Sequence, residues 1–227
     1  MFGFGRKSGS KQEISEKHLN RIVEFTCISP LITRKELERA MCVAYKNKYN
    51  SIVVNPINVE YARSYIDLKL KSTINLVSVI GYPLGETPTA VKLFEAKKAI
   101  ADGADELDVV IAVSRIKMGD YAYIKNEISR IVKANRKHVV KIIVEASSLN
   151  KGELSKVCAI CAKSKVNFVQ TSTGFASGGA TIEDIELIKN STQNKCEAKA
   201  SGGIENRSQA LVMLRAGATR IGTSREI

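Results

Sequence analysis

The chain has 227 residues, 44% of them hydrophobic and 26% charged, a composition that suits one large α/β domain with a substantial core. No apolar run is long enough to span a membrane, and five cysteines, an odd number, argue against a disulfide framework. A formal net charge of +12 permits attraction to phosphate-bearing partners, but the basic residues are scattered over many predicted helices.

The first 18 residues differ in composition from the rest. They are polar and rich in Gly, Ser and Lys, without the long apolar core of a signal peptide. We interpret residues 1–18 as a flexible basic leader of a cytoplasmic protein, and residues 19–227 as a single domain. The basic segment 125–138 has no interleaved aromatic residues for stacking on bases, which disfavours nucleic acid as a partner.

Strand-like and helix-like segments alternate along the domain. Apolar, β-branched runs predict strands over residues 22–26, 51–56, 75–83, 106–113, 139–147, 167–173, 196–203 and 220–224. Helical periodicity predicts helices over residues 31–49, 58–68, 89–101, 121–134, 151–164, 182–190 and 207–215. Thr33 and Thr181 are the expected N-caps of two of them, and Glu36 completes a capping box with Thr33.

Strict alternation implies parallel strands joined by right-handed crossovers. Eight such units in about 200 residues predict a closed (β/α)8 barrel, the TIM barrel, with the eighth helix short or absent. An open doubly wound sheet is the alternative. It more often carries a Gly-rich fingerprint directly after the first strand, where this chain reads TCISPLIT.

Side chains alternate between the two faces of a strand, so the pattern names the residues that face the barrel interior. Ionisable groups in such positions are costly unless they are paired, and Asp108, Lys141 and Lys199 lie on nearby strands. They form either a catalytic acid–base set or a salt-bridge cluster that only fixes the interior, and we favour the site. The inward candidates are Glu106, Asp108, Val110, Lys141, Ile143, Glu145, Phe168, Gln170, Ser172, Glu197, Lys199 and Ser201.

Four loops rich in Gly and hydroxyl groups follow strands of the predicted barrel: residues 81–85, 171–175, 201–204 and 222–224. The last two follow strands seven and eight, where barrels of this class commonly bind phosphate through backbone N–H groups. We therefore expect a phosphate site at this end of the barrel.

These motifs together resemble the deoxyribose-phosphate aldolase family over nearly the whole chain. The matching stretches are GYPLG, EAKKAIADGADELDVVI, VVKIIVEAS, NFVQTSTGF, KASGGIENRSQA and GATRIGTS. The resemblance implies a class I aldolase of deoxyribonucleotide catabolism that needs no metal or other cofactor. Such enzymes cleave 2-deoxyribose 5-phosphate to glyceraldehyde 3-phosphate and acetaldehyde through a lysine Schiff base. The implied partner is a small sugar phosphate, with no membrane, and a homodimer stays open.

The resemblance also assigns roles to residues. Asp108 matches the acidic proton relay of the family, and Lys199 matches its second lysine. The remaining ligand-binding candidates are Thr26, Lys141, Thr173, Gly174 and, in the phosphate loops of the family, Ser201, Gly202, Gly203 and Ser224.

Position 170 departs from the family. The Schiff-base lysine belongs to a motif that usually reads VKTSTGF, and this chain reads VQTSTGF, with Gln170 at that position. A carboxamide nitrogen is not nucleophilic and forms no imine, although it can hydrogen-bond a sugar hydroxyl. Without a second ammonium beside it, Lys199 also becomes a poorer nucleophile. The first strand departs as well, with Glu24, Phe25 and Thr26 where the family commonly has Asp-His-Thr.

Three functions remain open from the sequence. The first is an active aldolase that uses Lys199 or Lys141 as a displaced nucleophile. The second is a pseudoenzyme that binds a sugar phosphate and senses or regulates. The third is a different, non-covalent chemistry with Asp108 and Lys199 as acid and base.

Overall fold

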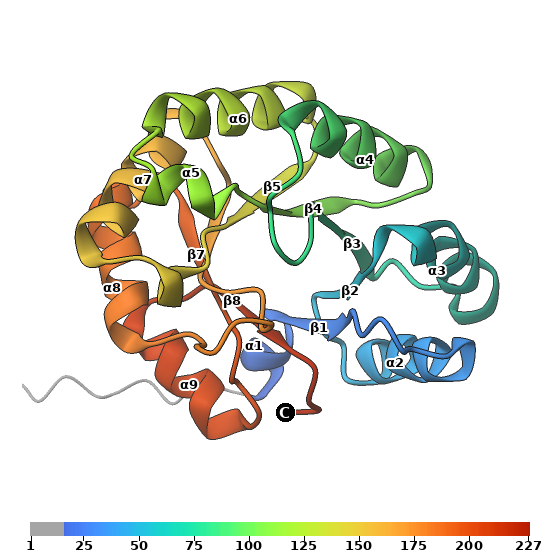
Figure 1. Ribbon diagram of the computed structural model, residues 1–227. Coiled ribbons are helices and arrows are strands. Elements are labelled where there is room, and N and C mark those ends of the chain that lie inside the picture. The colour runs from blue at the N-terminus through green and yellow to red at the C-terminus, as the bar shows by residue number, and fades with distance from the viewer. Residues whose placement is uncertain (1–15) are drawn as a thin grey trace, which may run out of the picture.

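The structure, a computed structural model, describes residues 16–227, and within them eight parallel strands close into a barrel (Figure 1). The strands pair in sequence order, and β1 pairs with both β2 and β8, so the sheet has no free edge. This closure confirms the predicted (β/α)8 barrel over the open sheet. The strands are β1 (Val23–Cys27), β2 (Ser51–Val54), β3 (Asn75–Ile80), β4 (Glu106–Val110), β5 (Val139–Ile143), β6 (Phe168–Gln170), β7 (Glu197–Ser201) and β8 (Arg220–Thr223).

Helices form the outer layer around the barrel (Figure 1). The α-helices are α1 (Glu16–Asn20), α2 (Arg34–Lys46), α3 (Val59–Tyr65), α4 (Thr89–Ala101), α5 (Val113–Lys117), α6 (Tyr121–Ala134), α7 (Lys151–Lys163), α8 (Ile182–Thr192) and α9 (Arg207–Ala216). Three further helical segments complete the set: η1 (Pro56–Asn58), the π-helical η2 (Ile66–Leu70) and η3 (Ala146–Ser148). No helix follows β8 within the described residues, as expected.

Local sequence explains where the helices begin. The Thr33 side chain accepts a hydrogen bond from the Glu36 backbone N–H, and the Glu36 carboxylate accepts one from the Thr33 N–H, which is the predicted capping box. Thr181 caps α8 in the predicted way. Asn150 forms a second capping box at the start of α7, one that the sequence reading did not name.

Two apolar clusters hold the layers together. The larger lies between strands and helices, and strand residues such as Leu76, Leu107 and Ile142 are fully buried in it. Each such side chain contributes roughly 1.5–3 kcal/mol through burial. The smaller cluster, Val53 with Val77 and Val79, lies on β2 and β3. The charged residues of the barrel interior named below come instead from β1, β4, β5, β7 and β8, and all but the half-buried one of β8 are buried.

The strands end earlier than the apolar runs suggest. The apolar run over residues 106–113 extends beyond β4, which ends at Val110. Val113 already belongs to α5, a short helix that the sequence did not predict. An apolar run continues through both elements because both are buried, so hydrophobicity alone does not mark the boundary. The predicted leader lies outside the described residues apart from its last three positions, which belong to α1.

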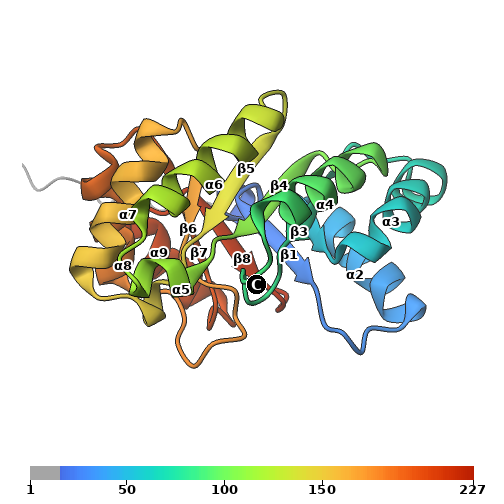
Figure 2. The ribbon, with the colours of Figure 1, turned by 45° about the horizontal axis from the view of Figure 1, so that its top comes forward.

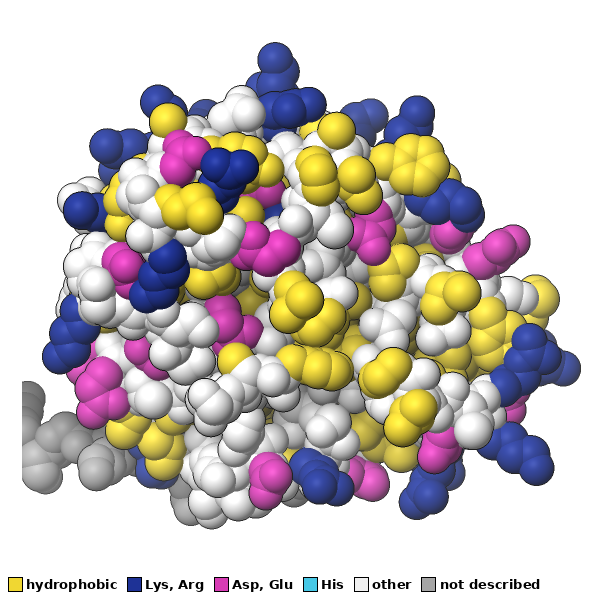
Figure 3. Space-filling view, viewed as in Figure 1, with side chains coloured by type: hydrophobic (Ala, Val, Ile, Leu, Met, Phe, Trp, Pro, Cys, Tyr) yellow, Lys and Arg dark blue, Asp and Glu magenta, His cyan; other side chains and the backbone are white. Residues whose placement is uncertain are grey.

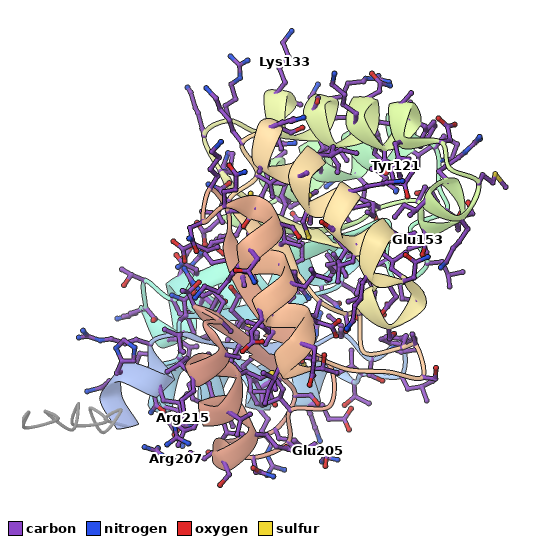
Figure 4. All side chains as sticks on the ribbon, turned by 90° about the vertical axis from the view of Figure 1, so that its left-hand side faces the viewer. Tyr121, Lys133, Glu153, Glu205, Arg207 and Arg215 are labelled. Atoms are coloured by element: carbon purple, nitrogen blue, oxygen red, sulfur yellow. The ribbon has the colours of Figure 1, made fainter. Side chains whose placement is uncertain are left out.

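Loops from distant parts of the chain project beyond the same end of the barrel. The loops after β1, β3 and β6 extend together on one side in Figure 2. The outer helices α6 to α9 turn charged side chains to solvent, as Lys133 and Arg215 do in Figure 4. Among the described residues, no helix is long and apolar enough to cross a membrane.

Candidate active site

Asp108 joins two lysines inside the barrel. The parallel register aligns Asp108 on β4 with Lys141 on β5, and Lys141 Nζ lies 2.9 Å from Asp108 Oδ1. Lys199, from β7 on the opposite side, donates to Asp108 Oδ2 at 2.5 Å. All three side chains are almost completely buried. The structure therefore brings together the acid and both lysines that strand alternation predicted to pair.

Three further charged residues extend this cluster. Glu24 on β1 pairs with Lys199 and lies 3.3 Å from Lys141 Nζ, and Glu106 lies 2.6 Å from the same Nζ. Arg220 on β8 approaches Glu24 at 3.7 Å. We call the six residues the central ion layer: Glu24, Glu106, Asp108, Lys141, Lys199 and Arg220. With three carboxylates and three cations, the layer is balanced in formal charge.

Within the central ion layer, oppositely charged neighbours stabilise the charged forms of Asp108 and Lys141. Burial would raise the pKa of Asp108, but the ammonium groups of Lys141 and Lys199 outweigh it, so this pKa lies below its ordinary value. Burial would lower the pKa of Lys141, but Asp108, Glu24 and Glu106 outweigh that effect and raise it. Lys141 therefore stays an ammonium at neutral pH, which is not a nucleophile.

A cavity of about 450 Å³ opens at the C-terminal ends of the strands, where a barrel of this class has its active site. Asp108 and Gln170 reach its wall, whereas its lining among the described residues includes neither Lys141 nor Lys199. Seven other predicted site residues line it: Thr26, Thr173, Gly174, Ser201, Gly202, Gly203 and Ser224. Lys141 thus lies in the central ion layer, outside the lining of this cavity.

Gln170 is held in one orientation at this wall. Its Nε2 donates to Ser201 Oγ at 3.0 Å and to the Ser172 carbonyl at 3.3 Å. The Ser201 hydroxyl donates to the same carbonyl at 2.5 Å, so the amide must present its nitrogen to this pair. Gln170 Oε1 is buried and receives no hydrogen bond from any residue in 16–227. A buried acceptor without a donor is costly, so this oxygen is available to a donor from water or from a ligand.

The glycine loop after β7 is fixed from both sides. The Thr171 hydroxyl donates to the Ser201 carbonyl at 2.9 Å and accepts from the Ser201 N–H at 3.0 Å. The Thr223 hydroxyl donates to the Ile204 carbonyl at 2.6 Å. Between these anchors Gly203 has a φ of +73°, a conformation that suits glycine, and a Cβ built on it would meet no atom within 4 Å. The predicted phosphate loop therefore stands open to the cavity.

Two predicted inward residues lie elsewhere. Glu145 follows β5 in the left-handed region at φ +50°, outside the strand alternation. Its carboxylate accepts from the Thr173 hydroxyl at 2.5 Å and so supports the loop after β6. Glu197 begins β7, is exposed, and accepts from the Thr219 hydroxyl at 2.6 Å.

The site also contains residues that the sequence reading did not select. Tyr82 lines the cavity, donates to the Thr173 carbonyl and packs edge to face on Phe175. Burial, reinforced by Asp108 and Glu145, raises the pKa of the Tyr82 phenol, so it is neutral at ordinary pH. Tyr82 lies in the GYPLG loop, which had been noted only for its glycines. Glu24 could have been found from its charge in the middle of the first strand.

No protein-family model matches the chain. The deoxyribose-phosphate aldolase of Thermococcus gammatolerans is 43% identical over 206 residues, covering 90% of this chain and 91% of that protein. The one from Lactiplantibacillus plantarum is 40% identical over 208 residues, covering 91% and 95%.

Solved structures agree with these relatives. A structure described as QR15, an aldolase, is 36% identical with a TM-score of 0.86, covering 92% of each chain. The tetrameric deoxyribose phosphate aldolase from Aeropyrum pernix is 31% identical with a TM-score of 0.84, covering 93% of this chain and 89% of that one. With such identity over nine-tenths of its length, this chain belongs to the deoxyribose-phosphate aldolase family.

Proposed function

We propose that this protein binds a phosphorylated sugar of the 2-deoxyribose 5-phosphate class without forming an imine, as a cytoplasmic pseudoenzyme with a sensing or regulatory role. The observation that carries the proposal is Gln170. It lines the cavity and offers a buried carbonyl oxygen, and the resemblance to the family assigns its position to the Schiff-base lysine, whose amine it lacks.

The two inward lysines offer no ready replacement. An imine needs a neutral amine that can reach the carbonyl carbon of the sugar. Lys199 and Lys141 are fully buried beneath the cavity wall, and each Nζ contacts at least two carboxylates. Releasing either amine would leave an uncompensated charge in the central ion layer.

The cavity is suited to reversible binding. Backbone N–H groups of the glycine loop at Gly202 and Gly203, together with Ser224, would receive the phosphate. Gln170 Oε1 accepts no hydrogen bond from the described residues, and it would accept one from a sugar hydroxyl. A homodimer is compatible with this role.

A second candidate is the family reaction with Lys199 as the amine. Lys199 is the direct register partner of Gln170 on the adjacent strand, and Asp108, to which it is bonded, lines the cavity. Lys199 would have to exchange its bonds to Glu24 and Asp108 for the substrate. Asp108 would then move the proton, the role that the resemblance to the family implies for it.

Acetaldehyde release from 2-deoxyribose 5-phosphate separates these candidates. We expect no release and no borohydride-trapped adduct for the native protein, measured by mass spectrometry. Gln170→Lys should create an adduct at position 170, because it supplies an amine beside Lys199. Native cleavage with an adduct on Lys199 would reject the pseudoenzyme and support the second candidate. Lys117→Gln, an exposed change on α5, is the control for the trapping reaction.

A further inference from the structure

A second cavity of about 400 Å³ adjoins the first at the mouth of the barrel. The two cavities share five lining residues, so one ligand can occupy both. We call the second cavity the apolar annex. Its lining residues are Ile28, Ser29, Pro30, Ile32, Asn55, Ile57, Asn58, Tyr82, Pro83 and Phe175, of which Ile28, Ser29, Ile32, Tyr82 and Phe175 also line the first cavity.

The annex is bordered by large apolar side chains that are exposed. Ile57 is 90% exposed and Phe175 is 52% exposed, and Leu31 and Leu84 on the neighbouring loops are also strongly exposed. Figure 3 shows hydrophobic side chains gathered around the hollow at this end of the barrel. Exposed apolar surface next to a polar cavity marks a binding surface more often than chance, and a sugar phosphate alone has no apolar group to cover it.

The annex is suited to an aromatic ring with polar edges. The rings of Tyr82 and Phe175 meet at 90° with centroids 5.5 Å apart, and the Phe175 side chain is half exposed, so it is accessible to another ring. Two carboxamides lie among the apolar walls. Asn55 Nδ2 donates to the Ile28 carbonyl at 3.1 Å, so the side-chain oxygen of Asn55 points away from that carbonyl and can accept a hydrogen bond. The Asn58 side chain makes no capping bond at the start of α3 and is free to pair.

We infer that the ligand is a nucleoside monophosphate, with its phosphate at the glycine loops after β7 and β8 and its base in the apolar annex. This inference rests on the proposed function and names the ligand class of that site. The annex is lined by the loops after β1, β2 and β3 and by Phe175 from the loop after β6. The first cavity, which it adjoins, is lined by the glycine loops and by Gln170, so a ligand that reaches from the glycine loops into the annex would hold its sugar in the cavity that Gln170 lines.

The chemistry of the sugar agrees with this assignment. A sugar that carries a base at C1 is locked as a closed ring and presents no aldehyde, so it cannot form an imine with any lysine. Gln170 is then the suitable residue at position 170, because its oxygen accepts a hydrogen bond from a sugar hydroxyl. Stacking of the base on an aromatic side chain contributes about 1–3 kcal/mol.

Calorimetry on the full chain tests the inference with three probes: thymidine 5′-monophosphate, 2-deoxyribose 5-phosphate and inorganic phosphate. We expect the nucleotide to bind at least about fivefold more tightly than the sugar phosphate, as stacking energies of this size imply. Ile57→Ser, which changes a residue that lines only the annex, should lower nucleotide affinity about fivefold and leave that of the sugar phosphate as it was. Leu68→Ser is the matched control, because Leu68 is 70% exposed on η2 and lines neither cavity.

The possible outcomes distinguish a failure of the nucleotide inference from a failure of the proposed function. Equal affinity for nucleotide and sugar phosphate, with no effect of Ile57→Ser, overturns the inference that the ligand is a nucleotide and leaves the proposed function standing. Binding of neither compound overturns both. A change of oligomeric state in Ile57→Ser on size-exclusion chromatography, without a change in nucleotide affinity, also overturns the inference, because it assigns the annex to a second copy of the chain.

Discussion

The central ion layer and the cavity wall above it treat buried polar groups in opposite ways. In the layer, every charge has an opposite charge within 4.0 Å, and Lys141 alone contacts three carboxylates. At the wall, Gln170 Oε1 receives no hydrogen bond from any described residue. Yet the two regions are adjacent, and Asp108 belongs to both.

This difference assigns a different task to each region. Charges that are already paired inside the protein hold the barrel interior and gain nothing from a ligand. Uncharged groups left unpaired at a cavity wall gain the most from one, because the ligand removes their desolvation cost. The layer is therefore the structural foundation of the site, and the wall above it is where the proposed binding would take place.

The largest effect should follow from breaking the ion layer. Lys141→Met leaves Glu24, Glu106 and Asp108 without the cation they share. Removing one partner of a buried pair costs about 3–5 kcal/mol, and we expect a loss of unfolding free energy of that size in urea titrations.

An exposed pair provides the control for this variant. Lys117→Met removes the partner of Glu153, but Lys117 is 46% exposed and water screens the pair, so we expect a loss below about 1 kcal/mol. Equal losses in Lys117→Met and Lys141→Met would contradict the structural role of the layer.

Acid should weaken the same layer. The pKa of Asp108 is lower in the folded protein than its ordinary value of 3.8, so its stabilisation is complete above that value and is lost as pH falls through the folded pKa. Lys141 is the reverse case: its pKa is raised, so its contribution is lost only as pH rises above about 10.5. Asp108→Asn should flatten the fall in unfolding free energy below pH 4. Asp67→Asn, in an exposed pair with Arg63, should leave the slope as it is.

Most of the fold follows from the sequence because it depends on repeated local patterns, whereas the wall residues were predicted from those patterns together with the resemblance to the family. Alternation put Asp108, Lys199 and Gln170 on the inner faces of their strands. It failed at Glu145, where the chain leaves the strand in a left-handed turn that a non-glycine residue rarely adopts. It also could not tell Lys141 from a ligand contact, because depth within the barrel depends on the stagger of neighbouring strands.

A charge placed in the glycine loop after β7 tests whether this part of the cavity wall receives the phosphate of the ligand. Gly203→Asp puts a carboxylate where a Cβ meets no protein atom within 4 Å, and two like charges about 4 Å apart repel by about 4 kcal/mol near a protein surface. We expect calorimetry to show at least a tenfold loss of affinity for 2-deoxyribose 5-phosphate. Gly203→Asn is the matched control, because it has the same shape and backbone strain without the charge. Equal losses in both variants would attribute the effect to the backbone and not to phosphate.

The smallest effect, and the one that isolates the wall, concerns Gln170→Met. Methionine keeps the length of the side chain and removes the oxygen that would accept the ligand hydroxyl. A neutral hydrogen bond contributes about 1 kcal/mol net, so affinity for 2-deoxyribose 5-phosphate should fall about fivefold. The unfolding free energy without ligand should change by less than about 1 kcal/mol. The variant loses the bonds from Nε2, but it no longer buries an unpaired oxygen, and the Ser201 hydroxyl keeps its bond to the Ser172 carbonyl. Calorimetry and urea titration on the same preparation measure the two quantities. A loss of stability as large as that of Lys141→Met, with affinity unchanged, would show that Gln170 belongs to the foundation and not to the binding wall.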